Sequence, residues 1–343
     1  MRHLPLMRAG SAVPIVRFLR DAGAPTERLL SEAGLPAWTL TEPDALVPAA
    51  AGARLLGAAA HEVGLRDVGL RAGRDADIES LGLYGRLIRR SATVREAVET
   101  ILHHHRFFSS NGRLWLDADG DDVAFRQAFT AKFDGMNEGW QQANHYVLMM
   151  MLGVLRLGAG PGWRPARVHL QTGPSAALRH ADAFAGAELR FSQPSTAIFL
   201  PAALLDEPLE RRVERDIPED LLDAWKASAP ADEFVRSVAQ IIETLSWDGY
   251  PDIHLTARVV GMGVRSLQRY LNEAGVTHDA LVGEARFATA AALLEETDTK
   301  ILDIALDLGY SDHAHFTRAF RRWAGCSPQA YRRNHAEGPA ASS

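Results

Sequence analysis

Cysteine is almost missing from this sequence, since Cys326 is the only one among 343 residues. A single cysteine excludes an internal disulfide and any zinc site built from several thiolates, and it is typical of a reducing compartment. Lysine is scarce as well, because Lys132, Lys226 and Lys300 are the only lysines among 37 basic residues. Arginine therefore carries almost all of the positive charge.

Long apolar runs are also absent. No stretch reaches the roughly 18 apolar residues that a membrane span needs. Residues 1–14 lack the apolar segment and the cleavage site of a signal peptide. We therefore expect a cytoplasmic protein with no membrane partner. The length, with 47% hydrophobic and 23% charged residues, suffices for about two globular domains.

The motifs of common enzymes are missing too. We find no Gly-x-Ser-x-Gly sequence, no phosphate-binding loop and no paired carboxylates in a recognisable frame. DNA-repair methyltransferases carry a helical module similar to the one described below, but their chemistry needs clustered cysteines. We predict that the chain is not an enzyme.

Two polar clusters raise the question of a metal site. The histidines at 103–105 are consecutive, so on a helix they point about 100° apart and cannot converge on one ion. Asp117, Asp119 and Asp121 resemble part of a calcium loop, but the glutamate expected at its twelfth position is missing. We predict no metal and no cofactor, and a hydrophilic turn at the aspartates.

The first two hundred residues mix helical and strand patterns. Helices are predicted over 13–34 and 48–64, with Gly34 and Gly64 as caps, from the capping box Thr93–Glu96 to about Phe108, and over 139–157. Strands are predicted over 114–116, 123–129, 167–171, 188–192 and 196–200, the first two forming a hairpin around 117–121. This pattern predicts an α+β domain with a small, mainly antiparallel sheet.

The composition changes after residue 205. Residues 206–231 are charged and broken by prolines, which predicts a linker with some helix. Residues 232–335 have a wholly helical pattern, and 336–343 are expected to be a disordered tail. We therefore place the N-terminal domain at 1–205 and an all-α domain at 232–335.

Two segments of the all-α part share one spacing. Ala257 stands four residues before Gly261, and Ala305 stands four residues before Gly309. In a helix-turn-helix unit the small residue allows a close helix crossing, and the glycine ends the first helix with a positive φ. Apolar pairs then pack each second helix, namely Leu267 with Leu271 and Phe316 with Phe320. The spacing predicts two helix-turn-helix units.

A helix predicted over 280–296 joins the two units and spans roughly 25 Å at about 1.5 Å per residue. Such a connector can place two reading helices about one DNA turn, ~34 Å, apart. Residues 232–335 contain 11 basic and 14 acidic residues, whereas 313–333 contain five arginines and no acid. The charge is thus segregated, and a local basic face remains available for phosphates.

Four segments of this region resemble the AraC/XylS family of transcription regulators: RSLQRYL at 265–271, IALDLGY at 304–310, HFTRAFRR at 315–322 and GCSPQAYR at 325–332. The segments DVGLRA at 67–72, SATVREA at 91–97 and FAGAELRF at 184–191 resemble the arabinose-binding-like sensor of one branch of that family. One position departs from the pattern, because Gly263 stands where the family has a serine N-cap.

The resemblance assigns roles in DNA binding. Arg265, Gln268 and Arg269 share one face of their helix, and arginine and glutamine suit base reading. A solvated polar face is the alternative for an arbitrary sequence. In the second unit the resemblance implies base contacts from His313, Thr317 and Arg318. We assign phosphate contacts to Arg321, Arg322 and Arg332.

A ligand site is expected in the N-terminal domain. The segment 139–157 carries the polar or aromatic residues Trp140, Gln141, Asn144 and His145 beside several methionines, a mixture that suits a small-molecule pocket. A core helix with a wet edge is the alternative.

The predicted function is a sequence-specific DNA-binding regulator controlled by a small-molecule effector. The resemblance further implies an activator that contacts RNA polymerase and an operator of double-stranded DNA. A homodimer is expected as well. The alternative is a constitutive DNA-binding protein whose N-terminal domain only dimerises.

Overall fold

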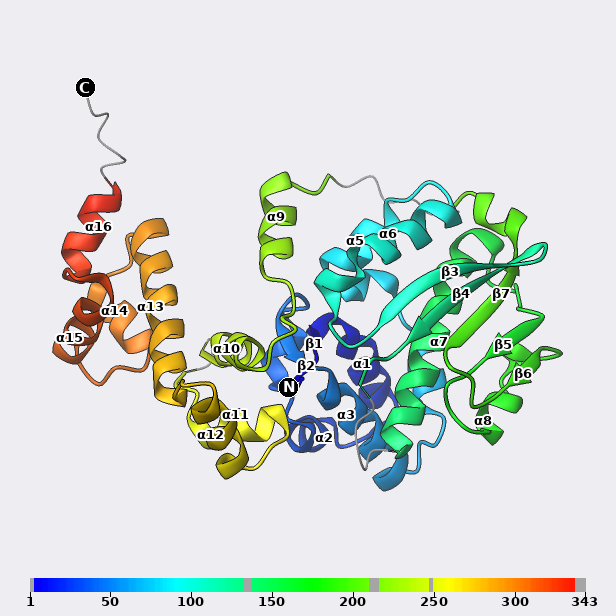
Figure 1. Cartoon of the computed structure of the whole chain (residues 1–343), viewed down its shortest axis with the longest axis horizontal. Coiled ribbons are helices and arrows are strands. Elements are labelled where there is room, and N and C mark those ends of the chain that lie inside the picture. The colour runs from blue at the N-terminus through cyan, green and yellow to red at the C-terminus, as the bar shows by residue number, and fades with distance from the viewer. Residues whose placement is uncertain (1–2, 132–136, 210–215, 247–248, 337–343) are drawn as a thin grey trace. The chain divides into compact units, whose positions relative to one another are not determined.

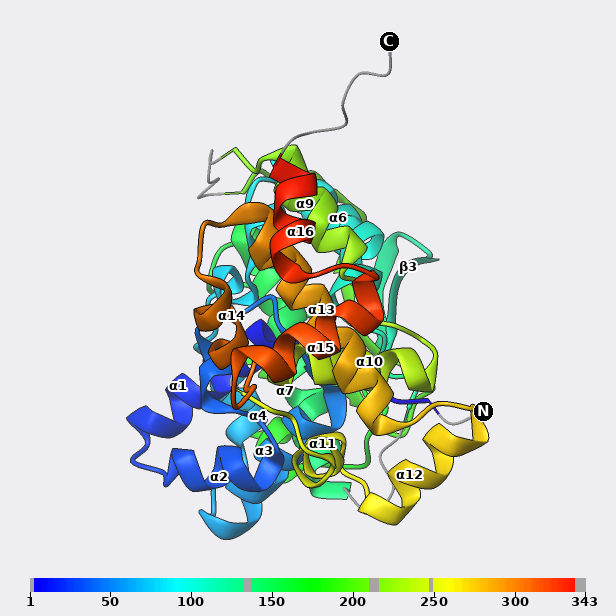
Figure 2. The same ribbon diagram turned by 90° about the vertical axis from the view of Figure 1, so that its left-hand side faces the viewer.

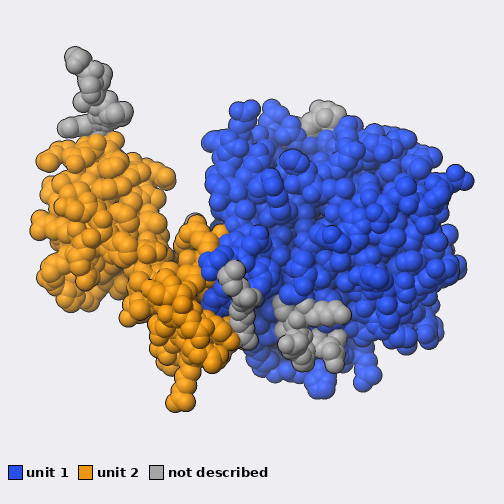
Figure 3. All heavy atoms as spheres, viewed as in Figure 1, with its two compact units in different colours: residues 1–234 blue, residues 235–343 orange. Residues whose placement is uncertain are grey.

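The computed structural model describes residues 3–131, 137–209, 216–246 and 249–336. The chain divides into two compact units, residues 1–234 and 235–343 (Figure 3). The tail predicted at 336–343 lies outside the described residues except for Ala336, where the last helix ends.

The N-terminal unit begins with helices and one short strand pair. Strand β1 (Leu6–Arg8) pairs antiparallel with β2 (Leu46–Pro48). The helices of this unit are α1 (Val13–Asp21), α2 (Thr26–Ala33), α3 (Ala49–Glu62), α4 (Val68–Arg74), α5 (Leu83–Arg89), α6 (Val94–Phe108), α7 (Asn137–Ala159), α8 (Ala176–Arg179) and α9 (Glu219–Ala227). Single 3-10 turns accompany them at Ala9–Ala12, Ala37–Leu40, Ile78–Leu81, Asp182–Phe184 and Ala202–Asp206.

Local signals account for most helix ends. Gly34 and Gly64 adopt the expected left-handed conformation, with φ of 73° and 75°. Thr93 caps α6 by accepting a hydrogen bond from the backbone of Glu96. The single helix predicted over 13–34 is wrong, because the chain breaks between α1 and α2 at Gly23, where φ is 71°, and Pro25 follows.

A five-stranded sheet has the order β3-β4-β7-β5-β6. Its strands are β3 (Arg113–Asp119), β4 (Asp122–Ala128), β5 (Arg167–His169), β6 (Glu188–Arg190) and β7 (Thr196–Pro201). Only β5 and β6 pair in parallel, so the predicted mainly antiparallel sheet is confirmed. The hairpin is tighter than predicted, because β3 and β4 pair up to Asp119 and Asp122 and leave Gly120 and Asp121 at the turn.

Helix α7 is the centre of the N-terminal unit (Figure 1). It packs against α3, α4 and strand β7. One apolar core lies between α7, the sheet, α5 and α6, and includes Phe125 and Leu152. A second core lies among α1 to α4 and includes Leu19 and Leu55, with Tyr146 from α7. Side chains from both cores meet beside α7, and that is where a cavity forms.

Helix α9 lies within the segment predicted to be a linker, but it packs onto the N-terminal unit. The indole of Trp225 is buried and donates a hydrogen bond of 2.9 Å to a carboxylate oxygen of Asp44. The guanidinium of Arg8 lies over the same ring and donates to the backbone carbonyl of Trp225 at 2.7 Å. The compact N-terminal unit accordingly extends to Phe234.

The C-terminal unit is helical in its described part. It contains α10 (Phe234–Leu245), α11 (Ile253–Val260), α12 (Val264–Glu273), α13 (His278–Glu296), α14 (Ile301–Asp307), α15 (His313–Ala324) and α16 (Pro328–Ala336). Helix α13 joins the α11–α12 pair to the α14–α15 pair (Figure 2). The predicted fold class, an α+β domain followed by an all-α domain with two helix-turn-helix units, is confirmed.

Candidate nucleic-acid interface and ligand cavity

The two helix-turn-helix units close with the same backbone hydrogen bonds. The amide of Met262 donates to the carbonyl of Ala257, and the amide of Tyr310 donates to that of Ala305, both at 2.9 Å. Gly261 and Gly309 both have a φ of 72°. This is the glycine-ended helix terminus that the sequence spacing predicts. The repeat in the sequence is thus a repeat in backbone geometry.

The second helices of the two units begin differently. Asp312 caps α15, and its carboxylate accepts a hydrogen bond of 2.7 Å from the amide of His315. This bond lowers the pKa of the Asp312 carboxyl. Gly263 precedes α12 and offers no side-chain cap. Helix α12 therefore lacks the stabilisation that a serine would add at that position.

Helix α12 buries Leu267 and Leu271 and exposes Arg265, Gln268 and Arg269. The Arg269 side chain lies over the ring of Tyr270 and pairs with Glu273 at 3.8 Å, with both charged groups more than half exposed. Such an exposed ion pair is weak, so the guanidinium can leave it for a nucleic acid. The structure places the three predicted base-reading residues on one open face.

Helix α15 buries Phe316 and Phe320 and exposes His313 and Arg318. Thr317 differs from these two residues, because its hydroxyl oxygen is covered and has no hydrogen-bond partner among the described residues. In this rotamer the hydroxyl does not face solvent. A contact from Thr317 to a base would therefore need a change of rotamer or would use the methyl group.

The predicted phosphate contacts are in two environments. Arg321 and Arg322 are exposed in the last turn of α15. Arg332 is half-buried, and its guanidinium donates to the backbone carbonyl of Thr299 at 2.6 Å and to that of Leu294 at 3.4 Å. These bonds tie α16 to the end of α13. Two donors of the Arg332 guanidinium, on Nε and Nη2, are thus engaged within the chain, and its phosphate contact stays a prediction.

Helix α13 connects the two helix-turn-helix units rigidly. It has 19 residues, about 28 Å at 1.5 Å per residue. At its middle, the guanidinium of Arg286 lies 4.6 Å from the ring of Tyr250 and 4.4 Å from that of Tyr310. Near its C-terminal end, Ala290 and Leu294 share a core with the second helix-turn-helix unit. The connector is thus packed against its neighbours rather than exposed on all sides.

The acidic residues of the hairpin in the N-terminal unit pair with arginines. Asp117 forms an ion pair with the guanidinium of Arg126 at 2.7 Å, and Asp119 pairs with Arg167. The three histidines of α6 do not converge on one point. The rings of His103 and His104 lie 4.7 Å apart and His104 bonds the backbone of Thr100, while His105 faces Tyr84. Among the described residues no group of three or more His, Cys, Asp or Glu side chains could hold a metal ion.

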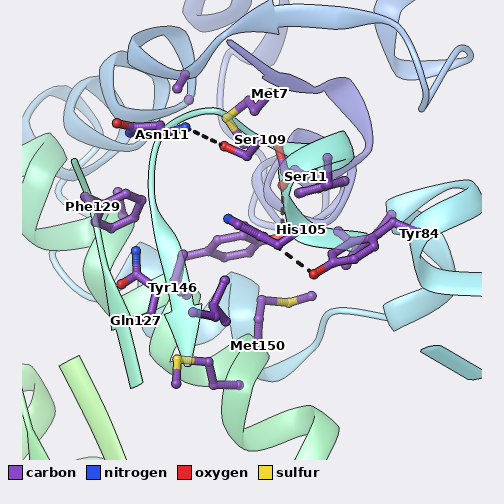
Figure 4. Close-up of a pocket in the computed structure, with 18 of the residues that line it drawn as sticks. Met7, Ser11, Tyr84, His105, Ser109, Asn111, Gln127, Phe129, Tyr146 and Met150 are labelled. Carbon is purple, nitrogen blue, oxygen red and sulfur yellow. Dashed lines mark hydrogen bonds between the residues drawn. The ribbon is translucent and has the colours of Figure 1, made fainter. Parts of the chain in front are cut away.

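The N-terminal unit contains an apolar cavity of about 160 Å³ between its two cores. In Figure 4, Gln127 of β4 and Phe129, which follows the strand, lie on one side and Tyr84 and His105 on the other. The Tyr84 hydroxyl approaches the Nδ1 atom of His105 at 3.5 Å and donates to the carbonyl of Ile101. Burial lowers the pKa of His105 to about 4, so the imidazole is neutral near pH 7.

The side chains predicted to bind an effector do not all reach this cavity. Trp140 lines it and packs against Phe129, with ring centroids 4.8 Å apart. Gln141, Asn144 and His145 are not among the lining residues. Asn144 accepts a hydrogen bond from Thr196 of the sheet. The buried ring of His145 has no hydrogen-bond partner among the described residues, and burial lowers its pKa to about 4.

Gln127 is one of the lining residues that the sequence interpretation missed. Its side chain is only 3% exposed, and its carbonyl oxygen has no hydrogen-bond partner among the described residues. The signal was present, because Gln127 stands two positions after the buried Phe125 in β4 and so shares its inward face, and Phe129 follows directly after the strand. A polar residue at a core-facing strand position indicates a functional group or an internal partner.

Among the described residues no helix is both long and apolar enough to cross a membrane. Two sequence models of protein families match the chain. The first, described as the N-terminal arabinose-binding domain of AraC transcription regulators, matches residues 23–209. The second, a helix-turn-helix domain, matches residues 256–334.

Two relatives match along most of their length. The ornithine utilization regulator of Pseudomonas aeruginosa is 24% identical over 273 residues, which are 77% of this chain and 78% of that protein. The HTH-type transcriptional regulator VirS of Mycobacterium tuberculosis is 27% identical over 336 residues, which are 95% of this chain and 96% of that protein. The solved structure of the transcriptional regulator CdpR from Pseudomonas aeruginosa is similar with a TM-score of 0.45 and 20% identity, over 93% of this chain and 96% of that one.

Proposed function

Because the chain belongs to the AraC family of transcription regulators, we propose that it reads a specific operator through α12 and α15 and that a small molecule in the N-terminal cavity controls this binding. The family are DNA-binding regulators and not enzymes. In this proposal residues 1–205 hold the effector, 232–335 bind DNA, and 206–231 connect the two.

The equivalence of the two helix-turn-helix units carries the DNA-binding part of the proposal. Each unit presents an exposed arginine, Arg269 or Arg318, on the open face of its second helix. Guanidinium groups can donate two hydrogen bonds to a guanine edge in the major groove. Exposed Arg321 and Arg322 then supply phosphate contacts, which do not depend on the base sequence.

Affinity for a selected operator tests this assignment. An operator is first selected from random DNA with the full chain, and binding to it and to scrambled DNA is then compared. Arg269→Ala and Arg318→Ala should each lose about 1–3 kcal/mol at the operator, roughly 5- to 150-fold, and should relax the preference at one base pair. Arg236→Ala is the matched control, because it removes the same charge from α10, which lies outside both helix-turn-helix units.

The comparison with scrambled DNA decides the result. If a variant loses the same factor on both DNAs, its arginine contacts phosphate and its base-reading role is refuted. If Arg236→Ala loses as much discrimination as the other two variants, the effect comes from overall charge rather than from the reading helices.

The cavity supports the effector part of the proposal. It is enclosed by both cores of the N-terminal unit, and such apolar cavities with few polar groups are common ligand sites. A sugar such as arabinose needs a hydrogen-bond partner for each of its hydroxyl groups. An ionised amino acid such as ornithine needs side chains of opposite charge. The lining offers few free polar groups, and it contains no Asp, Glu, Arg or Lys side chain among the described residues. Activation through RNA polymerase and formation of a homodimer remain predictions.

A further inference from the structure

The cavity in the N-terminal unit has a lining without formal charge. No Asp, Glu, Lys or Arg is among the described residues that line it, and its one basic group, His105, is neutral near pH 7. An ionised ligand would lose its hydration on entering and find no opposite charge inside. Such a transfer is strongly unfavourable. The lining therefore excludes carboxylates and ammonium groups as preferred ligands.

Most polar groups around the cavity already have partners within the chain. The Tyr146 hydroxyl donates to the carbonyl of Ser11 at 2.9 Å, and the Ser11 hydroxyl donates to that of Arg8. The hydroxyl of Ser109 accepts from the amide of Asn111, and the Asn111 side chain accepts from the amide of Ala131. These pairs leave little capacity for a ligand with many hydroxyl groups.

Gln127 is different. Its side-chain carbonyl is buried at the cavity and accepts no hydrogen bond within the described part of the chain. A buried acceptor without a partner is unfavourable, and a donor that reaches it removes this cost. Figure 4 shows the Gln127 amide beside Phe129, at the border of the cavity. The lining thus favours a ligand with one hydrogen-bond donor.

The size and composition of the cavity indicate the shape of that ligand. A volume of about 160 Å³ is close to the roughly 150 Å³ of an apolar cavity that holds one benzene molecule. Six aromatic side chains and three methionines contribute to the lining. Aromatic rings and thioether sulfurs both pack favourably against the face or edge of a further ring.

We propose that this cavity binds a neutral aromatic molecule of about one ring that carries a single hydrogen-bond donor, and that the donor pairs with the side-chain carbonyl of Gln127. The inference builds on the proposed function only in taking the cavity as the effector site. The ring occupies the space between the two cores, and Gln127 sets its orientation.

Binding of three simple probes to the full chain tests the ligand class. Phenol, toluene and benzoate have nearly the same ring and differ in donor and charge. Calorimetry or ligand-induced thermal stabilisation should show binding of phenol and toluene, with phenol preferred by about threefold to tenfold, the usual contribution of one hydrogen bond. Benzoate should bind far more weakly than either. Benzoate binding as tight as that of phenol would overturn the proposal.

The variant Gln127→Leu tests the orientation, because it replaces the amide by an apolar side chain of similar size and so removes the acceptor. The preference for phenol over toluene should vanish, while toluene binding should persist or improve. If the preference remained, the assignment of Gln127 would be wrong. Ala143→Leu provides a second test, because Ala143 lines the cavity from α7 and the added side chain fills ligand space. It should weaken phenol and toluene alike, and unchanged binding of both would place the ligand elsewhere.

Operator affinity measured with the same proteins separates this inference from the proposed function. If phenol binds as described but operator affinity is unchanged by saturating phenol, the ligand site stands and its control of DNA binding fails. If none of the three probes binds while the selected operator is still bound specifically, the ligand class is refuted and the DNA-binding function stands.

Discussion

Replacing Trp225 by alanine should release α9 from the N-terminal unit without unfolding the unit itself. Trp225 is 4% exposed and is the buried residue of this helix. Its indole donates to Asp44, lies 5.8 Å from the ring of Phe107 and is covered by the Arg8 guanidinium. Leu221, one turn before Trp225 on the same side of the helix, is 40% exposed, whereas Leu222 is partly buried against the same core. Trp225 is therefore the most deeply buried side chain of this contact.

The size of the effect follows from burial. Truncation of a buried tryptophan to alanine costs about 3–5 kcal/mol, and each 1.4 kcal/mol changes an equilibrium about tenfold. The population of released α9 should therefore rise by about 100-fold to a few thousand-fold, until release is complete. Helices that are docked by few side chains open locally, well below the free energy of global unfolding.

The scarcity of lysine makes this opening measurable. Lys226 follows Trp225 directly, and Lys300 lies in the other unit. A lysine-specific protease should cut after Lys226 at least ~100-fold faster in Trp225→Ala, because cleavage tracks the open population when reclosing is fast. Cleavage after Lys300 should not change. Dividing each rate by that of the urea-unfolded chain removes any direct effect of the substitution on the protease.

Leu221→Ala is the matched control on the same helix, since it removes an apolar side chain that is 40% exposed. It should leave the cleavage rate at Lys226 within about twofold, because exposed substitutions change stability by less than ~0.5 kcal/mol. An equal rate in Trp225→Ala and the unchanged chain would refute the docking of α9. Equal acceleration in both variants would show that helix content alone, rather than burial of Trp225, controls cleavage.

Three further predictions concern the remaining elements. The free energy of unfolding should fall as the pH decreases from 6.5 towards about 4. The rings of His105 and His145 are buried and their pKa values are lowered to about 4, so the unfolded chain takes up protons that the folded chain does not accept. Denaturant titrations should show a flatter dependence of this free energy on pH in His145→Gln, and an equal slope would contradict the assignment. Gly263→Ser should raise the melting temperature of the C-terminal unit by about 1–3 °C through a new N-cap of a few tenths of a kcal/mol, and a calorimetric scan showing no rise would mean that α12 is capped in another way. Insertion of five base pairs between the two contacted segments of the operator should abolish specific binding, since α13 cannot turn α15 to the far side of the duplex, and a footprint that survives the insertion would show that the two units bind independently.

Features decided by neighbouring residues could be predicted from the sequence. Hydrogen bonds between residues at most five positions apart form the turns at Gly261 and Gly309 and the cap at Asp312. The cap is missing at Gly263 because glycine has no side chain to accept such a bond. Their residue types and spacing therefore indicated two helix-turn-helix units and the exposed faces of α12 and α15. The alternation of β3 and β4 likewise indicated a hairpin.

Features decided by distant residues could not be predicted in this way. Trp225 meets Asp44 across 181 positions, so nothing in the proline-broken segment 206–231 revealed that its helix is docked. Arg332 belonged by spacing to a basic face, but its donors reach carbonyls 33 and 38 positions earlier.

The ligand cavity shows the same division. The sequence by itself determined that α7 is a long helix with polar and apolar sides, and that two helix-turn-helix units follow in the C-terminal part. Only the tertiary structure decided which side chains of α7 meet β4 and α6, and hence that Gln127 and His105 line the cavity while Asn144 contacts the sheet. Local hydrogen bonds are set by chain neighbours, whereas a cavity is defined by the packing of elements that are far apart in the chain.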